Sequence, residues 1–129
     1  MRPSFVRRWI PLAGALAIAA CGSDAAAPVA MCAAAYTPSV LAHVTDSVTG
    51  TPLAQTAAGV IQDRTIVDSL RYFGPPDQMA GGGKPGTYAV TITRAGYADW
   101  KLTNVVVTPT GYCNTVNTVT LQARLVPAP

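Results

Sequence analysis

Three cysteines and one histidine are the residues of this sequence whose side chains are most reactive. A cysteine thiolate can attack an electrophile, bind a metal ion or form a disulfide, and an imidazole can carry a proton near neutral pH. The cysteines stand at positions 21, 32 and 113, and the histidine is His43. A structural metal site needs about four ligands. Two distant cysteines and a single histidine are too few, so we expect no metal ion and no other cofactor.

The sequence also lacks the groups from which a hydrolytic site is assembled. His43 and Asp46 lie three residues apart in an alternating segment, so in a strand they point to opposite faces. No Gly-x-Ser-x-Gly nucleophile motif occurs, and the absence of glutamate leaves no paired carboxylates. We expect the protein not to be an enzyme. We also expect His43 to face solvent beside threonines, with no pocket in which it meets both a carboxylate and a hydroxyl.

A glycine-rich stretch ending in lysine, at residues 81–84, suggests a phosphate-binding loop. That motif requires a glycine five positions before the Gly-Lys pair and a serine or threonine after it. Here Gln78 occupies the first position and Pro85 the last. The stretch therefore indicates a flexible turn and predicts no nucleotide.

The N-terminal segment has the layout of an export signal. Three arginines precede a short apolar stretch, Trp9 to Ala20, which Cys21-Gly22-Ser23-Asp24 ends. A membrane-spanning helix needs about 20 apolar residues, and this stretch is much shorter. A positive head, a short apolar core and small residues at its end are typical of a secretory signal peptide.

Residues 18–21, Ile-Ala-Ala-Cys, closely resemble the lipobox of bacterial lipoproteins. The resemblance implies that the Cys21 thiol receives a diacylglycerol, that the chain is cut before Cys21 and that the new amino terminus is acylated. Several acyl chains hold a protein stably on a bilayer. Gly22, where lipoproteins kept at the inner membrane often carry aspartate, favours the outer membrane in a Gram-negative cell. The alternative is an ordinary signal peptide with Cys21 incidental.

With Cys21 assigned to lipid, Cys32 and Cys113 remain, 81 residues apart. In the oxidising compartment that an export signal implies, they can form a disulfide. The alternative is a pair of unlinked, buried thiols.

The net charge of +3 comes from the leader, which holds three of the nine basic residues. From Cys21 onward six basic residues balance six aspartates. A neutral body predicts no binding to nucleic acid. The partner we expect is the membrane, reached through the lipid, together with an envelope protein or a glycan.

From residue 39 onward the sequence alternates with the period of β-strands. We expect strands at 39–48, with Val40, Ala42, Val44 and Val48 on one face, and at 57–62, 65–72, 87–97, 100–108 and 114–125. Residues 73–86 are rich in glycine and proline and predict a loop. The expected fold is all-β, a single β-sandwich of immunoglobulin-like or transthyretin-like type with about seven antiparallel strands. The expected domains are a signal peptide at 1–20, a lipidated tether at 21–35 and the sandwich at 36–129.

Short motifs in this region resemble the carboxypeptidase regulatory-like domain. They are Val44-Thr45-Asp46, the turn Thr49 to Pro52, the small-residue strand Ala57 to Val60, Gly86-Thr87-Tyr88 and Gly96-Tyr97. The resemblance covers residues 40–125 and implies a transthyretin-like or carbohydrate-binding-like sandwich, in which Tyr97 packs into the core.

Aromatic side chains are the remaining candidates for ligand binding. Sugar-binding surfaces stack sugar rings on exposed aromatic faces, and Tyr72 and Trp100 fall near expected strand ends. The function that we expect first is a non-catalytic structural or interaction module, held at the cell envelope by its lipid. The alternative is a carbohydrate-binding module that uses Tyr72 and Trp100.

Overall fold

The computed structural model describes residues 32, 35–64, 66–111 and 113–129. The expected signal peptide, the lipidation site Cys21 and most of the expected tether lie outside the described residues. The chain divides into two units between residues 31 and 32, and every described residue belongs to the second unit.

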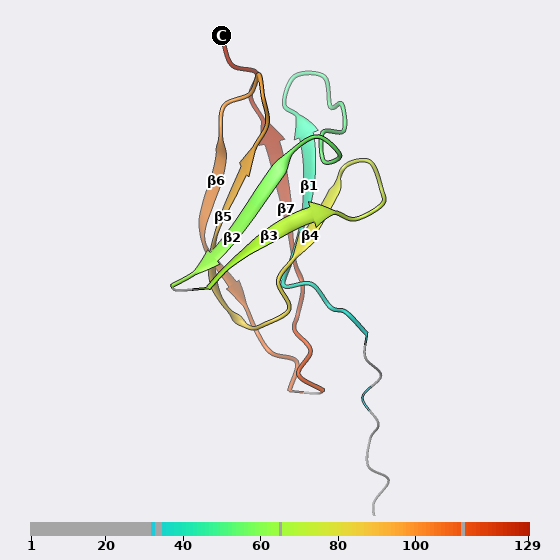
Figure 1. Ribbon diagram of the computed structural model, residues 1–129, viewed down its shortest axis with the longest axis vertical. Helices are drawn as coiled ribbons and strands as arrows, with labels where there is room; N and C mark the ends of the chain where they lie inside the picture. Colours follow the sequence, from blue (N-terminus) through green and yellow to red (C-terminus); the bar gives the residue numbers. More distant parts are fainter. Residues whose placement is uncertain (1–31, 33–34, 65, 112) are drawn as a thin grey trace, which may run out of the picture. The chain divides into compact units, whose positions relative to one another are not determined.

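The described residues form an all-β domain, as the alternating pattern predicts (Figure 1). It has seven strands and no helix in these residues. They are β1 (Val40–Asp46), β2 (Ala58–Asp63), β3 (Ile66–Tyr72), β4 (Gln78–Gly81), β5 (Gly86–Thr93), β6 (Trp100–Val107) and β7 (Val119–Leu125).

The strands follow one another in the order β6-β5-β2-β3-β4-β1-β7. All neighbours are antiparallel except β1 and β7, which run parallel over their full length, from the Val40–Val119 pair to the Asp46–Leu125 pair. This parallel pair departs from the expected antiparallel arrangement. It places the first and last strands of the domain side by side.

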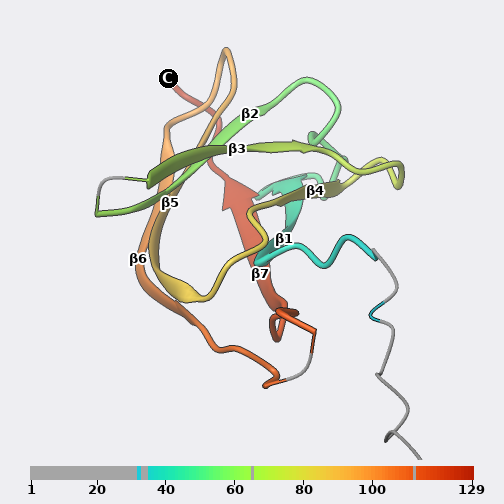
Figure 2. The same cartoon turned by 60° about the horizontal axis from the view of Figure 1, so that its bottom comes forward.

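Strand β3 joins the two layers of the sandwich. Its first five residues pair with β2, whereas Arg71 and Tyr72 pair with β4. Figure 2 shows the consequence: β2, β5 and β6 form one layer, and β4, β1 and β7 form the other. The sheet therefore folds over on itself at β3, and its inner faces enclose one core.

The sheet can fold over at β3 because glycines lie on both sides of Leu70, the one buried residue of that strand. A Cβ atom on Gly59 would come 2.7 Å from the Leu70 Cβ, and one on Gly81 would come 2.7 Å from the Ser69 carbonyl oxygen. Both distances are too short for any side chain. Leu70 thus fills the space that two glycines on the neighbouring strands leave open.

Alternate residues of the long strands point into the core, as period-two patterning requires. On β5 the buried residues are Tyr88, Val90 and Ile92, and on β7 they are Leu121, Ala123 and Leu125. The period-two alternation from which the sequence predicts these strands therefore separates their inward residues from their outward ones. Every described buried side-chain nitrogen or oxygen has a hydrogen-bond partner.

One strand is missing from the prediction, and several predicted bounds are wrong. The predicted strand 87–97 ends at Thr93, and the predicted strand 114–125 begins at Val119. Residues 78–81 form β4 within the segment predicted as a loop, because Met79, Ala80 and Gly81 are buried between β1 and β3. The first strand ends at Asp46 and not at residue 48, so Val48 lies in the following turn with 79% of its surface exposed.

Three connections meet at one end of the sandwich, drawn at the bottom of Figure 1. They are the β2–β3 turn, the β4–β5 loop and the β6–β7 loop. The pairing of Gly86 with Val107 and of Val40 with both Gly81 and Val119 brings the two loops to this end, and the pairing of Gln62 with Ala89 brings the β2–β3 turn to it. We call this the disulfide end, because Cys113 lies in its β6–β7 loop and is bonded to Cys32. The β1–β2 loop and the C-terminal residues lie at the opposite end.

Breaking the disulfide should destabilise the domain without abolishing its fold. For a loop of 81 residues, the chain-entropy argument gives at most about 4.5 kcal/mol, from which native-state strain subtracts. The double variant Cys32→Ser/Cys113→Ser should unfold at lower urea concentration than the oxidised protein and keep its β-type circular dichroism. Reduction should have no further effect on that variant. Complete unfolding of the variant in the absence of urea would contradict this picture.

Candidate functional site

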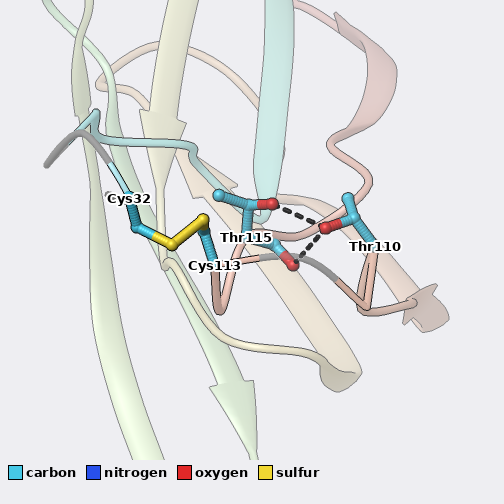
Figure 3. The surroundings of a disulfide bond; sticks show 4 residues. All are labelled: Cys32, Thr110, Cys113 and Thr115. Carbon is cyan, nitrogen blue, oxygen red and sulfur yellow. Dashed lines mark hydrogen bonds between the residues drawn. A yellow bond between two sulfur atoms is a disulfide. The ribbon is translucent and has the colours of Figure 1, made fainter. Parts of the chain in front are cut away.

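The disulfide between Cys32 and Cys113 confirms the pairing that the cysteine count predicts. Their Cα atoms are 5.4 Å apart, within the range for disulfides. Cys113 lies in the β6–β7 loop, where the backbone N–H of Thr110 donates to the Thr115 carbonyl. The Thr110 hydroxyl also bonds to the carbonyl and to the hydroxyl of Thr115 (Figure 3). The start of the described domain is therefore fastened to a loop that is itself closed by hydrogen bonds.

His43 lies on the outward face of β1, as predicted, but it has a carboxylate partner that the sequence analysis did not assign. Its Nδ1 atom is 2.7 Å from Oδ2 of Asp77, and the two side chains are 23% and 30% exposed. The backbone carbonyl of Asp77 also accepts a hydrogen bond from the N–H of Val44, at 2.7 Å. Asp77 thus fastens the β3–β4 turn to β1 through two groups.

This pair supplies two of the three groups of a hydrolytic triad. Asp77 can fix the neutral imidazole with its proton on Nδ1, which leaves Nε2 as the acceptor. Among the described residues, no hydroxyl forms a hydrogen bond with Nε2. We expected threonines beside His43 and nothing for it to activate; the structure adds a carboxylate, that of Asp77, to its neighbours.

The sequence carries no local signal for the contact between His43 and Asp77. The residues are 34 positions apart, and Asp77 follows two prolines in a segment predicted as a loop. The contact arises because β4 pairs with β1, with Gln78 opposite His43. Recognition of β4 from the sequence would have placed Asp77 beside that histidine.

The glycine-rich stretch does not form a phosphate-binding loop. The N–H of Gly82 donates to the Asp68 carboxylate at 3.1 Å, so a phosphate would meet a negative charge there. The Lys84 carbonyl accepts hydrogen bonds from the hydroxyls of Ser39 and Tyr88, at 2.7 and 2.8 Å. Gly82 has a φ of 76°, and a Cβ there would come 2.8 Å from the Ser39 side chain. The stretch is a tightly packed turn.

Tyr72 and Trp100, the predicted aromatic ligand residues, lie on different strands. Tyr72 ends β3 and is 43% exposed, and its hydroxyl donates to the Gly74 carbonyl. Trp100 begins β6, is half-buried and packs against the core, so it is less exposed than we expected. Strands β2 and β5 separate β3 from β6 in the sheet.

The end of the sandwich opposite the disulfide is organised around Asp46. Its carboxylate accepts hydrogen bonds from the backbone N–H groups of Val48 and Thr49, at 2.7 and 3.0 Å, and from the Tyr97 hydroxyl at 2.7 Å. Tyr97 packs against the core, as predicted, and the Arg94 guanidinium lies 5.1 Å from its ring centroid. Asp46 therefore connects the turn after β1 to the turn before β6.

These hydrogen bonds shift the ionisation of both partners in opposite directions. The Thr49 N–H, then the Tyr97 hydroxyl and the Val48 N–H, hold the pKa of Asp46 below its usual value of 3.8. The hydrogen bond to Asp46 raises the pKa of Tyr97 above 10.0. The ionised aspartate and the neutral phenol are thus the pair that the fold favours.

Comparison with known proteins assigns no function to this chain: no protein-family model and no curated protein matches it. Within the described residues, no three histidine, cysteine or aspartate side chains gather as they would around a metal ion. The same residues include no helix of the length and apolarity needed to cross a membrane.

Removing the Tyr97 hydroxyl should weaken the fold in a pH-dependent way. The lowered pKa of Asp46 stabilises the native state above pH 3.8, and this contribution disappears as the pH falls below that value. The raised pKa of Tyr97 stabilises the native state below pH 10.0 and is lost as the pH rises further.

The test compares urea unfolding of Tyr97→Phe with that of Tyr72→Phe across this pH range. The Tyr97 variant should unfold at lower urea concentration at neutral pH and lose less stability on acidification than the parent. The Tyr72 variant should follow the parent. Equal pH profiles for the Tyr97 variant and the parent would show that Asp46 does not depend on this phenol.

The bond between His43 and Asp77 should contribute little to stability. Both side chains are partly exposed, and ion pairs in such positions are typically worth less than about 1 kcal/mol. We expect Asp77→Asn to lower the unfolding free energy by no more than that amount, as measured in urea at neutral pH. A loss of several times this size would assign the pair a structural importance that its exposure does not indicate.

Proposed function

We propose that this protein is an exported lipoprotein, anchored in a membrane of the cell envelope through lipid on Cys21. Its sandwich acts there as a non-catalytic structural or interaction module. The observation that carries the proposal is the disulfide between Cys32 and Cys113. Structural disulfides persist in exported proteins and are rare in reducing compartments. This bond therefore supports the reading of the N-terminal segment as an export signal.

The position of the disulfide also fits a lipid anchor. Cys21 precedes Cys32 by only eleven positions, and the bond fastens Cys32 to the β6–β7 loop. As a flexible coil, the ten residues between the two cysteines reach about 17–19 Å on average. Under the proposal, the lipid on Cys21 holds one end of this segment in the bilayer, and the disulfide holds Cys32 on the sandwich. The sandwich therefore stays close to the bilayer.

The proposal of a non-catalytic module rests on the residues around His43. Asp77 could orient the imidazole, but a serine or threonine hydroxyl on Nε2 is missing from the described residues. Acyl transfer also needs donors aimed at a developing oxyanion, as well as a nucleophile next to the base. The His43–Asp77 pair connects β1 to the β3–β4 turn on a half-exposed surface, which is a structural use.

A carboxypeptidase regulatory-like domain remains our proposal for the family, on the motifs alone. Two of these motifs, Val44-Thr45-Asp46 and Gly96-Tyr97, meet through the hydrogen bond between Asp46 and Tyr97. Their 51-residue separation in the sequence therefore closes into one contact. This supports the view that the motifs belong to one structural pattern.

Carbohydrate binding is the weaker proposal. A sugar ring is usually held by aromatic faces that share one surface, but Tyr72 and Trp100 lie on strands that two others separate. Trp100 also packs against the core. No observation favours this function over an interaction module.

The lipid anchor can be tested directly in cells of the source organism or a bacterial host. Intact-mass analysis of the membrane-extracted protein should give the chain from Cys21 with added acyl groups. The variant Cys21→Ala should leave the membrane fraction and lose the acyl mass. A control variant, Cys32→Ser/Cys113→Ser, should keep both. An unmodified protein cut at another position would contradict the proposal.

A further inference from the structure

The start of β3, directly after the turn from β2, exposes two adjacent apolar residues at the disulfide end. Ile66 is 52% exposed and Val67 is 61% exposed. The first four residues of β3, from Ile66 to Ser69, are all exposed, so both faces of the strand are open to solvent there. We call Ile66 and Val67 the apolar tip. A strand that only covered the core would bury every second residue, and this one buries only Leu70.

A hollow of about 400 Å³ separates the apolar tip from the β4–β5 loop. Ile61 and Tyr88 line it together with the tip, and Gly82, Gly83 and Lys84 bound its other side. A second hollow, of about 550 Å³, begins at the same Gly83 and Lys84 and extends to Asn114 and Thr115 beside Cys113. The two hollows share Gly83 and Lys84, so the β4–β5 loop lies between the apolar tip and the β6–β7 loop.

The surface around the tip carries both basic and acidic side chains. The basic residues Arg64 and Lys84 are both exposed; Arg64 precedes the tip in the sequence and Lys84 lines the hollow beside it. Two carboxylates lie nearby, those of Asp63, which pairs with Ile66, and of Asp68. The Asp68 carboxylate accepts hydrogen bonds from the N–H groups of Ser69 and Gly82. The local charge is balanced, so electrostatic attraction alone would hold no anionic partner strongly.

We propose that the apolar tip enters the headgroup region of the membrane to which the protein is anchored. This inference rests on the proposed lipidation of Cys21. Within the expected tether, the disulfide fixes Cys32 at the same end of the sandwich as the tip. If the ten residues between Cys21 and Cys32 formed a flexible coil, they would reach about 17–19 Å on average. An anchored domain meets the bilayer at a high effective concentration, so two apolar side chains suffice for a contact that the free domain would not make.

A bilayer fits this surface better than the other occupants. Exposed aliphatic residues flanked by arginine and lysine are the composition of segments that lie at a membrane interface. Lys84 lines both hollows, so its exposed side chain lies beside the tip together with the aspartate Asp68. The free domain should remain in solution, because its local charge is neutral and its apolar tip is small.

The test uses tryptophan as a depth probe on the chain that begins at Cys21, with a lipid coupled chemically to its thiol. In a Trp100→Phe background, Val67→Trp reports on the tip, and Val48→Trp reports on a valine at the opposite end that is even more exposed, at 79% against 61%. The protein is bound to vesicles of phosphatidylethanolamine with a minority of phosphatidylglycerol, some carrying brominated acyl chains. We expect bromine to quench the tip probe several-fold more than the control probe.

Because the lipid is attached chemically, this result does not depend on natural acylation. A chain with no acyl mass in cells would overturn the proposed function, whereas equal or absent quenching of the two probes would overturn the membrane contact. Amide hydrogen exchange of residues 64–68 in the unsubstituted protein gives a second measurement, since it should slow on vesicles only when the lipid is attached. If the exchange did not change on vesicles, and the tip crosslinked in cells to one envelope protein, the tip would contact a protein partner and not the bilayer.

Discussion

The change of partner along β3 is the constraint on which this fold depends. One strand pairs with β2 over its first five residues and with β4 over its last two, so the chain changes layers within it. The glycines on either side of Leu70 permit this, because any Cβ at Gly59 or Gly81 would overlap atoms of β3. The same change of partner leaves the start of β3 without a neighbour on its β4 side, which exposes the apolar tip.

Each end of the sandwich is closed by a different chemical device. At one end a covalent bond joins Cys32 to the β6–β7 loop. At the other end the Asp46 carboxylate connects two turns through hydrogen bonds to Val48, Thr49 and Tyr97. The disulfide depends on redox conditions and the carboxylate on pH, so the two ends respond to different changes in the surroundings. The core between them is apolar and responds directly to neither.

The sequence predicts the elements whose patterns are local. The inward faces of β5 and β7 follow from strict alternation, and the pairing of Cys32 with Cys113 follows from the cysteine count once Cys21 is set aside. β4 escapes prediction because its four residues lie among prolines and glycines, and only tertiary pairing with β1 and β3 makes them a strand. The contact of His43 with Asp77 depends on that strand, so it could not be predicted from the sequence either.

The parallel pair of β1 and β7 has a consequence for how the domain is completed. β7 is the last strand of the chain and hydrogen-bonds only to β1, the first. Such non-local pairing closes slowly, because a long loop must be ordered before its contacts form. Until Leu125 has been synthesised, the edge of β1 that pairs with β7 has no partner, and a nascent chain presents an open sheet to whatever binds extended polypeptide. Any protein that binds extended polypeptide therefore has access to this edge of β1 until β7 has paired with it.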